Sequence, residues 1–388
     1  MNYEKILSRT VQNIQPSGIR KFFDLLNDKK DVISLTVGEP DFMTPWHVRA
    51  TAIESLEKGK TYYTSNDGIM ELRQEICNYL GRRFGLAYNP KNEVIVTVGG
   101  SEAIDIGVRA LVEPGDEVII PIPAFVCYGP IVEMAHGVPV YIETKPEDKF
   151  KLTPEALRAA ITDKTKLLIL PFPNNPTGAV LNREELEAIA DVLRGTDIIV
   201  LSDEIYAELT YGFKHTSIAT LEGMWERTIT VSGFSKAYAM TGWRLGYLCA
   251  PAPLVSQMHK IHQYAIMCAP TTSQLAAIDA LKNGDEDIQM MASEYDRRRR
   301  YILKGLREIG IDCFEAEGAF YVFPNIGKFG LTSNEFCQRL LDEKGVAIVP
   351  GNAFGSCGEG FARISYAYSV EHITKAIKAM GEFVEGLK

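Results

Sequence analysis

Short apolar runs rich in β-branched residues alternate with helix-length segments through the middle of the chain. The runs are EVIVTVGG (93–100), DEVIIPIP (116–123), KLLILPFP (166–173), DIIVLSDEIY (197–206) and RTITVSGFSK (227–236). Their apolar residues are mostly consecutive, which is typical of strands buried on both faces. Such strands, separated by helical segments, predict an α/β fold with a mostly parallel sheet flanked by helices. Ligands of such sheets gather at the carboxyl ends of the strands.

The domain organisation is predicted from the length of the chain and from a change in the pattern of predicted helices and strands along it. A chain of 388 residues is too long for one ordinary core, so we expect two domains. From about residue 285 a long helical stretch leads into short strand-like runs such as GAFYVFPNI (318–326), and a last helix begins at Val370. We therefore predict a large domain over 47–284 and a smaller α+β domain over 285–388. Residues 1–46 are predicted to form an N-terminal arm and part of the small domain.

Charge and cysteine content narrow the class of protein. A net charge of −9 argues against a nucleic-acid-binding protein, which needs clustered Lys and Arg. The basic run RRRR (297–300) follows Glu294 and Asp296, and we interpret it as a solvated helix face or subunit contact. The seven cysteines are odd in number, are scattered and contain no C-x-x-C, which indicates free thiols in a reducing compartment.

Membrane and metal sites are not expected. The N-terminus MNYEKILSRT lacks an apolar signal region, and no uninterrupted apolar stretch approaches 18 residues, so we expect a cytoplasmic protein. The six histidines are not spaced as a metal set. His259 and His262 share a helix face, and a structural role is favoured over a ligand pair.

Three polar residues follow predicted strands, where a ligand is expected. Lys236 follows TITV, Asp203 follows DIIVLS, and Asn175 follows LLILPFPN. A lysine amine must be neutral to attack an aldehyde, and burial and nearby cations lower its pKa. An acidic group beside a ring nitrogen keeps a pyridine protonated, so the pattern indicates pyridoxal 5′-phosphate (PLP). The alternatives are a core-edge lysine for Lys236 and a helix N-cap for Asp203.

Seven motifs then carry a resemblance to a known family. In chain order they are VGEPDF, YTSNDGIMELR, GGSEAI, PNNPTG, SDEIY, GFSKAYAMTGWRLGY and ARISYA. Over nearly the whole chain, from about Pro16, it resembles the class I/II aminotransferases, which are fold type I PLP enzymes similar to aspartate aminotransferase. The likeness is strongest to the branch of aspartate, aromatic and N-acetyl-diaminopimelate aminotransferases. It implies a homodimer with shared active sites and ping-pong transfer of the amino group of an L-amino acid to 2-oxoglutarate.

The resemblance also implies the roles of individual residues. Lys236 would be the Schiff-base lysine and proton shuttle, and Asp203 would pair with the pyridine nitrogen. Tyr206 and Asn175 would hydrogen-bond the cofactor's O3′ oxygen. Arg363 would grip the substrate α-carboxylate, a planar bidentate task. The backbone of Gly38 would contact the same carboxylate. Phe125 would stack on the cofactor ring, and the alternative is a phenylalanine that only packs in the core. Tyr63 would reach the phosphate bound by the neighbouring subunit.

The phosphate site has a physical rationale as well. GGSEAI lies between a strand and a helix, so the backbone N–H groups of Gly100, Ser101 and Glu102 would face an anion at a helix N-terminus. Arg244 would add a charge-assisted contact. Many relatives have Ser three residues before the lysine, where this chain has Gly233, and we assign the phosphate hydroxyl to Ser235 instead.

Substrate choice is where the sequence says least. In relatives the entrance is built from the N-terminal segment, the loop near 40–46 and the partner subunit. Here this region offers Ile14, Ile19, Phe22, Phe42 and Trp46, with Arg20 and Lys21 nearby. The apolar set favours aromatic amino acids or aspartate as donors, with N-acetyl-diaminopimelate as an alternative, although the same residues also suit packing of the arm onto a dimer.

Two other functions share much of this pattern. A PLP-dependent β C–S lyase or cyclopropane-forming synthase has the same fold and many of the same site residues. A catalytically silent regulator on this fold is the alternative from another class. The presence of Lys236, Asp203 and Arg363 counts against silence.

Overall fold

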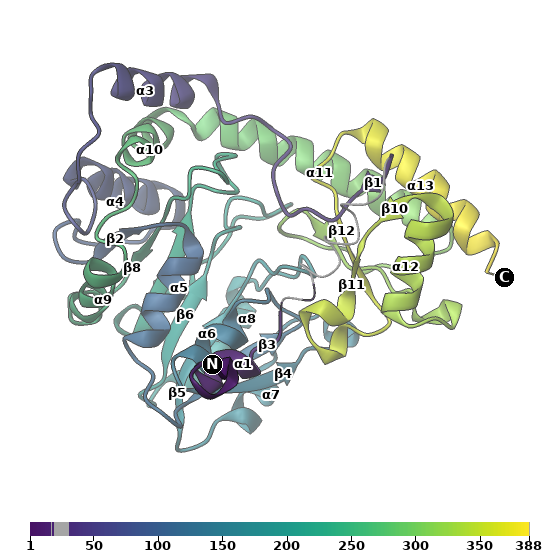
Figure 1. Cartoon of the computed structure of the whole chain (residues 1–388), viewed down its shortest axis with the longest axis horizontal. Helices are drawn as coiled ribbons and strands as arrows, with labels where there is room; N and C mark the ends of the chain where they lie inside the picture. The colour runs from purple at the N-terminus through teal and green to yellow at the C-terminus, as the bar shows by residue number, and fades with distance from the viewer. Residues whose placement is uncertain (17, 19–30, 388) are drawn as a thin grey trace.

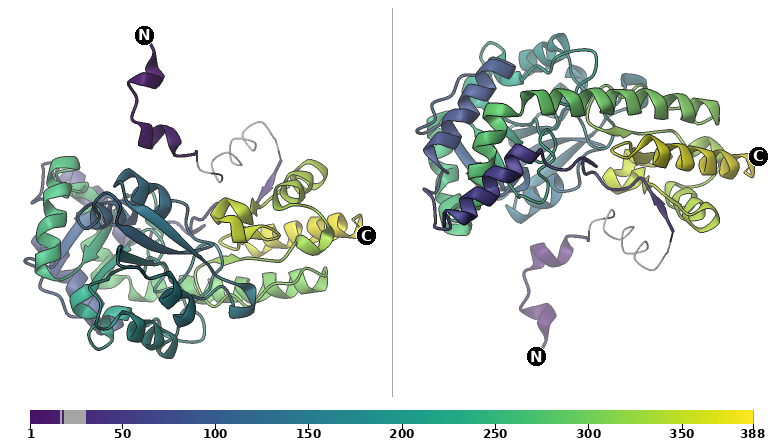
Figure 2. Two further views of the ribbon diagram at one scale, coloured as in Figure 1. Left: turned by 90° about the horizontal axis from the view of Figure 1, so that it is seen from below. Right: turned by 90° about the horizontal axis from the view of Figure 1, so that it is seen from above.

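The computed structural model of the chain describes residues 1–16, 18 and 31–387. Four of the entrance residues named above, Ile19, Arg20, Lys21 and Phe22, lie outside the described residues. Near the N-terminus a short 3-10 helix η1 (Tyr3–Lys5) and helix α1 (Arg9–Asn13) project from the body of the molecule (Figure 2). Their apolar side chains Tyr3, Ile6, Leu7 and Val11 are exposed.

A seven-stranded sheet forms the centre of the large part of the molecule (Figure 1). Its order is β2 (Val94–Thr97), β8 (Gly246–Cys249), β7 (Thr228–Gly233), β6 (Ile199–Asp203), β5 (Thr165–Leu170), β3 (Glu117–Ile122) and β4 (Val138–Glu143). Strand β8 is antiparallel to both neighbours, and every other pair is parallel. The predicted α/β fold with a mostly parallel sheet is confirmed, and all five predicted strands form. Strands β4 and β8 were not predicted.

Helices cover both faces of this sheet. On one face lie α5 (Gly100–Arg109), α6 (Tyr128–Met134) and α9 (Ala252–Ala265), and on the other lie α7 (Pro154–Ala160) and α8 (Arg183–Leu193). The two apolar layers use alternate residues of one strand, such as Ile119 and Ile120 of β3. Consecutive apolar residues in the sequence thus serve two cores, as expected for a sheet buried on both faces. Helices α3 (Trp46–Glu57), α4 (Met70–Phe84) and α10 (Thr271–Asn283) pack beside the β2 and β8 edge.

The remaining helices and strands form the smaller part of the molecule, around a three-stranded sheet. Strands β11 (Val349–Pro350), β12 (Ala362–Ser365) and β9 (Tyr321–Val322) pair antiparallel in that order. They are surrounded by α11 (Asp285–Glu308), α12 (Ser333–Lys344) and α13 (Val370–Glu385), and α11 runs along the top of Figure 1 from one part to the other. Strand β1 (Ile33–Ser34) pairs in parallel with β10 (Val346–Ala347), so the N-terminal segment joins this part. The domain boundaries at 46/47 and 284/285 remain a prediction.

Short 3-10 helices occupy several connections. They are η2 (Pro146–Asp148), η3 (Ile218–Thr220), η4 (Trp225–Arg227), η5 (Gly327–Phe329), η6 (Gly351–Phe354) and η7 (Ser356–Gly358). Helices α8 and α12 begin with capping boxes, Asn182 with Glu185 and Thr332 with Glu335, which fix where each helix starts. Within the described ranges, the helices lack the combination of length and hydropathy that crossing a bilayer requires.

The basic run on α11 corrects one expectation. Arg298 and Arg299 are only 6% and 8% exposed, so a solvated helix face is the wrong description for these two. Arg298 donates to both carboxylate oxygens of Asp41 at 2.8 Å, and Arg299 pairs with Asp296. The other two arginines of the run are exposed and pair with acidic residues on the same helix. Two of the four arginines, Arg298 and Arg299, are therefore buried side chains of α11 held by hydrogen bonds and ion pairs.

Candidate active site

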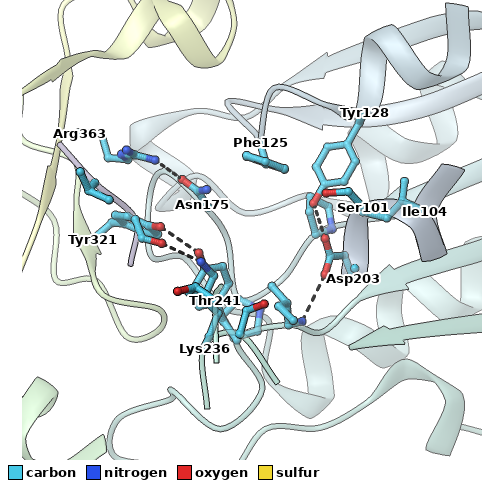
Figure 3. A pocket seen from close by; sticks show the side chains of 18 of the residues that line it. Ser101, Ile104, Phe125, Tyr128, Asn175, Asp203, Lys236, Thr241, Tyr321 and Arg363 are labelled. Atoms are coloured by element: carbon cyan, nitrogen blue, oxygen red, sulfur yellow. Dashed lines mark hydrogen bonds between the residues drawn. The ribbon is translucent and has the colours of Figure 1, made fainter. Parts of the chain in front are cut away.

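A cavity of about 390 Å³ opens at the carboxyl ends of the central strands, between the two parts of the molecule. Figure 3 shows the side chains that surround it: Ser101 of α5, Tyr128 of α6 and Asp203 of β6 belong to the large part, and Tyr321 and Arg363 belong to β9 and β12. The predicted site residues that line it are Gly38, Gly100, Ser101, Phe125, Asn175, Asp203, Tyr206, Ser235, Lys236, Arg244 and Arg363. The sheet explains this convergence, because parallel strands end at one edge.

Lys236 lies at the bottom of the cavity, three residues beyond the end of β7. Its Nζ donates a hydrogen bond to the carbonyl oxygen of Gly38 at 2.7 Å. Burial is the main cause that lowers the lysine pKa to about 8. Nearby Arg363 and Arg244 contribute to this lowering, while Glu39 and Asp203 act in the opposite direction. The amine is therefore neutral in part of the molecules near neutral pH, which is what attack on a carbonyl requires.

Asp203 ends β6 and is buried at the other side of the cavity. Its Oδ2 accepts a hydrogen bond from the Tyr128 hydroxyl at 2.7 Å, and its Oδ1 accepts one from the backbone N–H of Ile205 at 3.2 Å. Burial raises the pKa of the carboxyl even though these hydrogen bonds lower it. A buried carboxylate of this kind gains most from a cationic partner, such as a protonated ring nitrogen.

Arg363 supplies a buried guanidinium on the β12 side. Nη1 donates to the side-chain oxygen of Asn175 at 3.0 Å, and Nη2 donates to the carbonyl of Thr36 at 2.5 Å. The Tyr321 and Phe354 rings lie 4.6 and 4.9 Å from the guanidinium carbon. Its buried Nε has no hydrogen-bond partner among the described residues. A buried unused donor beside a cavity indicates a place for an acceptor, and a carboxylate matches the planar guanidinium.

Two tyrosine hydroxyls meet between these groups. The hydroxyls of Tyr206 and Tyr321 lie 2.9 Å apart, and burial raises the pKa of Tyr206 well above its ordinary value. The Tyr321 hydroxyl also explains the glycine at position 38, since a Cβ there would lie 2.1 Å from it. Sequence reasoning missed Tyr321 because its run was interpreted only as a strand.

The predicted phosphate site is a turn closed by glycines at the start of α5. Gly99 has φ of +81°, and a Cβ there would lie 2.7 Å from Nη2 of Arg244, so the arginine lies directly against this turn. Gly233 is explained in the same way, because a Cβ there would approach Cα of Gly246 to 2.9 Å. Ser235 is buried and lines the cavity, which supports its choice as the phosphate hydroxyl.

Some predicted residues lie elsewhere. The Tyr63 side chain is 80% exposed and does not line the cavity, and the Glu102 side chain turns away to contact His262. Phe42 packs edge-to-face on Tyr295 with ring centroids 5.5 Å apart and lines a second hollow with Thr241 and Arg244. Trp46 is exposed, and neither residue lines the cavity itself.

Tyr128 was missed as well. It occurs in PIPAFVCY, three residues after Phe125. Phe125 precedes a turn, and α6 begins at Tyr128, so the sequence carried no clear signal that the two rings would meet. The rings of Phe125 and Tyr128 meet edge-to-face with centroids 6.1 Å apart.

The fold and this cavity together define an α/β enzyme with a reactive lysine, a buried carboxylate opposite it and an arginine suited to a carboxylate. Residues 30–380 match the family model described as aminotransferase class I and II. The chain belongs to this family and is an aminotransferase, and the family is known to use PLP.

Relatives cover nearly the full length of the chain. It is 53% identical to a putative aminotransferase, YugH, of Bacillus subtilis, covering 97% of this chain and 98% of that protein. It is 46% identical to an aspartate aminotransferase of Pyrococcus abyssi, covering 96% and 97%. A probable N-acetyl-LL-diaminopimelate aminotransferase of Bacillus subtilis is 43% identical, covering 98% and 96%. The crystal structure of an aromatic aminotransferase from Pyrococcus horikoshii superposes with a TM-score of 0.90 at 45% identity, covering 95% of this chain and 99% of that one.

Proposed function

We propose that this aminotransferase uses PLP bound in the cavity at Lys236 to move the amino group of an L-amino acid to 2-oxoglutarate. The observation that carries the proposal is the convergence of Lys236, Asp203 and Arg363 on one cavity. The donor set fits the cofactor. The start of α5, with Ser235 and Arg244, suits a phosphate, Asp203 suits a protonated ring nitrogen, and Phe125 offers an aromatic face.

The chain's own residues account for the steps around the cofactor. PLP supplies an electrophilic carbonyl and an electron sink when bound. Lys236 would hold the cofactor through its neutral amine, and Nζ would take up and deliver the proton that moves during amino-group transfer. Asp203 stabilises positive charge on the ring, and its buried hydrogen bonds keep it fixed in place. Tyr206 and Asn175 are placed to donate to the cofactor's O3′.

Arg363 orients the substrate in this proposal. Its fork binds the α-carboxylate common to all amino and oxo acids, so it holds both the donor and 2-oxoglutarate. Because one carboxylate site serves both, the donor product must leave before the acceptor enters. This accounts for a ping-pong order of binding.

The donor is proposed to be aromatic or aspartate, with N-acetyl-diaminopimelate as the alternative. Apolar side chains line the cavity beside the reactive groups, among them Val37, Ile104, Phe125 and Ile205. They suit an aromatic donor. The names of the relatives support the same set, since aspartate, aromatic and N-acetyl-diaminopimelate aminotransferases all resemble this chain at similar identity.

A homodimer and a cytoplasmic location complete the proposal. Large apolar side chains are exposed on the α3 side of the molecule and around the 61–68 loop, and they are Met43, Trp46, Tyr62, Tyr63, Tyr264 and Met267. Such a set indicates a surface covered by another subunit. Tyr63 lies on it, as a residue that reaches a neighbouring site should. All seven cysteines are free, which supports a reducing compartment.

A donor screen tests the proposal. The purified protein is mixed with 2-oxoglutarate and with phenylalanine, tyrosine, aspartate, alanine or N-acetyl-diaminopimelate in turn, and glutamate is measured. We expect parallel double-reciprocal plots and the highest kcat/KM with an aromatic donor or aspartate. A lead of more than about tenfold for alanine, or roughly 1.4 kcal/mol, would reject the preference. Release of pyruvate and thiol from a cysteine conjugate would instead indicate a lyase.

A further inference from the structure

His262 on α9 is fully buried behind the predicted phosphate site, with 0% exposure. Its Nδ1 lies 2.6 Å from Oε1 of Glu102, and its Nε2 lies 2.9 Å from the carbonyl oxygen of Asn66. A carboxylate and a carbonyl can only accept hydrogen bonds. With an ionised Glu102, both ring nitrogens donate, and this geometry fits a doubly protonated imidazolium.

The surroundings of His262 favour this charged form. Burial alone lowers the pKa of His262, but the hydrogen bond and charge of Glu102, the Asn66 carbonyl and the charge of Asp67 outweigh it, and the pKa is raised. His259, one turn earlier on the same helix, is paired with Asp67 and with Gln263. The charged groups facing the ring are thus Glu102 of α5 and Asp67 of the loop before α4.

Glu102 places a negative charge near the predicted phosphate site, and its contact with His262 offsets that charge. Glu102 lies in the first turn of α5, the helix whose N-terminus lines the cavity. A carboxylate there repels a phosphate dianion, because like charges at short distance oppose binding. The side chain instead contacts His262 through Oε1 and accepts the backbone N–H of Val98 through Oε2. The Glu102 carboxylate thus links the turn 98–102 to His262 and fixes the backbone of that turn at Val98.

We propose that His262 is a positioning residue for phosphate binding, which cancels the charge of Glu102 and holds the turn 98–102 in its binding shape. The inference rests on the proposed cofactor. Helix α9 packs beside α5 (Figure 1). His262 contacts Glu102 of α5 but does not line the cavity. Through Nε2 the same ring holds Asn66, in the loop that carries Tyr63. One buried cation thereby fixes the turn that faces this subunit's phosphate and the loop predicted to reach its neighbour's.

The test compares two ligands that differ only in the phosphate. Dissociation constants of PLP and of pyridoxal, which lacks the phosphate, are measured by absorbance titration of cofactor-free protein. His262→Gln leaves the Glu102 carboxylate without its cation, and we expect PLP to bind about tenfold more weakly while pyridoxal changes less than about twofold. The double variant His262→Gln/Glu102→Gln removes the repelling charge as well, and we expect it to recover PLP affinity to within about threefold of the wild type.

The control is His259→Gln, which lies on the same helix but contacts Asp67 and Gln263. PLP affinity should stay within about twofold of the wild type. Equal weakening of PLP and pyridoxal in His262→Gln, or a double variant as weak as the single one, would show that His262 only packs the helix. If the single variant does not fold, the double variant alone decides, since it lacks the unpaired buried carboxylate. A wild-type protein that does not bind PLP refutes the proposed function itself.

Discussion

The hydroxyl of Tyr128 is expected to control the charge on Asp203, and Tyr128→Phe tests this. The variant keeps the ring against Phe125 and removes the 2.7 Å hydrogen bond to Oδ2. A hydrogen bond to a charged group contributes about 1.5–3 kcal/mol. If that stabilisation acts on the charged carboxylate during catalysis, kcat/KM falls roughly tenfold to a hundredfold.

The pH profile separates this effect from a general loss of structure. Burial already raises the pKa of Asp203, and the Tyr128 hydrogen bond lowers it. Removing that bond raises the pKa further, so the carboxylate is protonated at a higher pH. The acid limb of kcat/KM against pH should move to higher pH, while the limb set by Lys236 stays in place.

The matched control is Tyr366→Phe. Tyr366 is also fully buried, and its hydroxyl donates to the carbonyl of Ala319 at 3.0 Å, but it does not line the cavity. Tyr366→Phe should lower the free energy of unfolding by about 1 kcal/mol and leave the acid limb of the kcat/KM profile unchanged. An acid limb that does not move in Tyr128→Phe, or that moves equally in the control, would refute the link between Tyr128 and Asp203.

Four further outcomes are expected. Lys236→Ala should lose the visible absorption of the bound cofactor and nearly all transfer activity, and ordinary turnover would exclude it as the proton shuttle. Asp203→Asn should bind some cofactor but turn over at least about a hundredfold more slowly, roughly 2.7 kcal/mol of barrier, as measured by kcat. Tyr63→Phe should weaken PLP binding in a dimer detected by sedimentation, whereas a fully active monomer contradicts the shared site. Gly233→Ser should lower the free energy of unfolding by about 1–3 kcal/mol in urea titrations, because its Cβ meets Gly246, and unchanged stability would refute that steric reading.

The strands that the sequence predicted are those with consecutive apolar residues. Strand β4 lies at one edge of the sheet and was missed because most of its residues are exposed or half-buried, which breaks the run of apolar residues. Strand β2, at the other edge, is buried along its whole length and was predicted. Strand β8 is a four-residue strand that begins with Gly246, and its antiparallel direction leaves no helix-length crossover to reveal it. Local pattern finds strands buried on both faces better than exposed or reversed strands.

Some residues of the candidate site could be predicted from the local sequence, and others could not. Residues that follow predicted strands, such as Asp203 and Lys236, could be placed at one edge of the sheet from topology alone. Tyr321 could not, because its position depends on how β9 packs across the cavity from the large sheet. The entrance set stays a prediction, because four of its residues lie outside the described part of the chain. Phe42 packs on Tyr295 of α11 and also lines a hollow shared with Thr241 and Arg244, a placement that depends on distant segments. Contacts between distant segments carry no local signal.

The charges around the cavity also explain how one lysine can serve two steps. Arg244 and Arg363 both lower the pKa of Lys236, so the amine is readily neutral before anionic ligands bind. A phosphate near Arg244 and a carboxylate at Arg363 each offset one of these positive charges. The proton affinity of Nζ therefore rises as the ligands bind, because less positive charge opposes protonation. In the proposed mechanism, the same group would thus be a nucleophile when the cavity holds few anions and a proton acceptor once the substrate carboxylate is in place, which is the order that amino-group transfer requires.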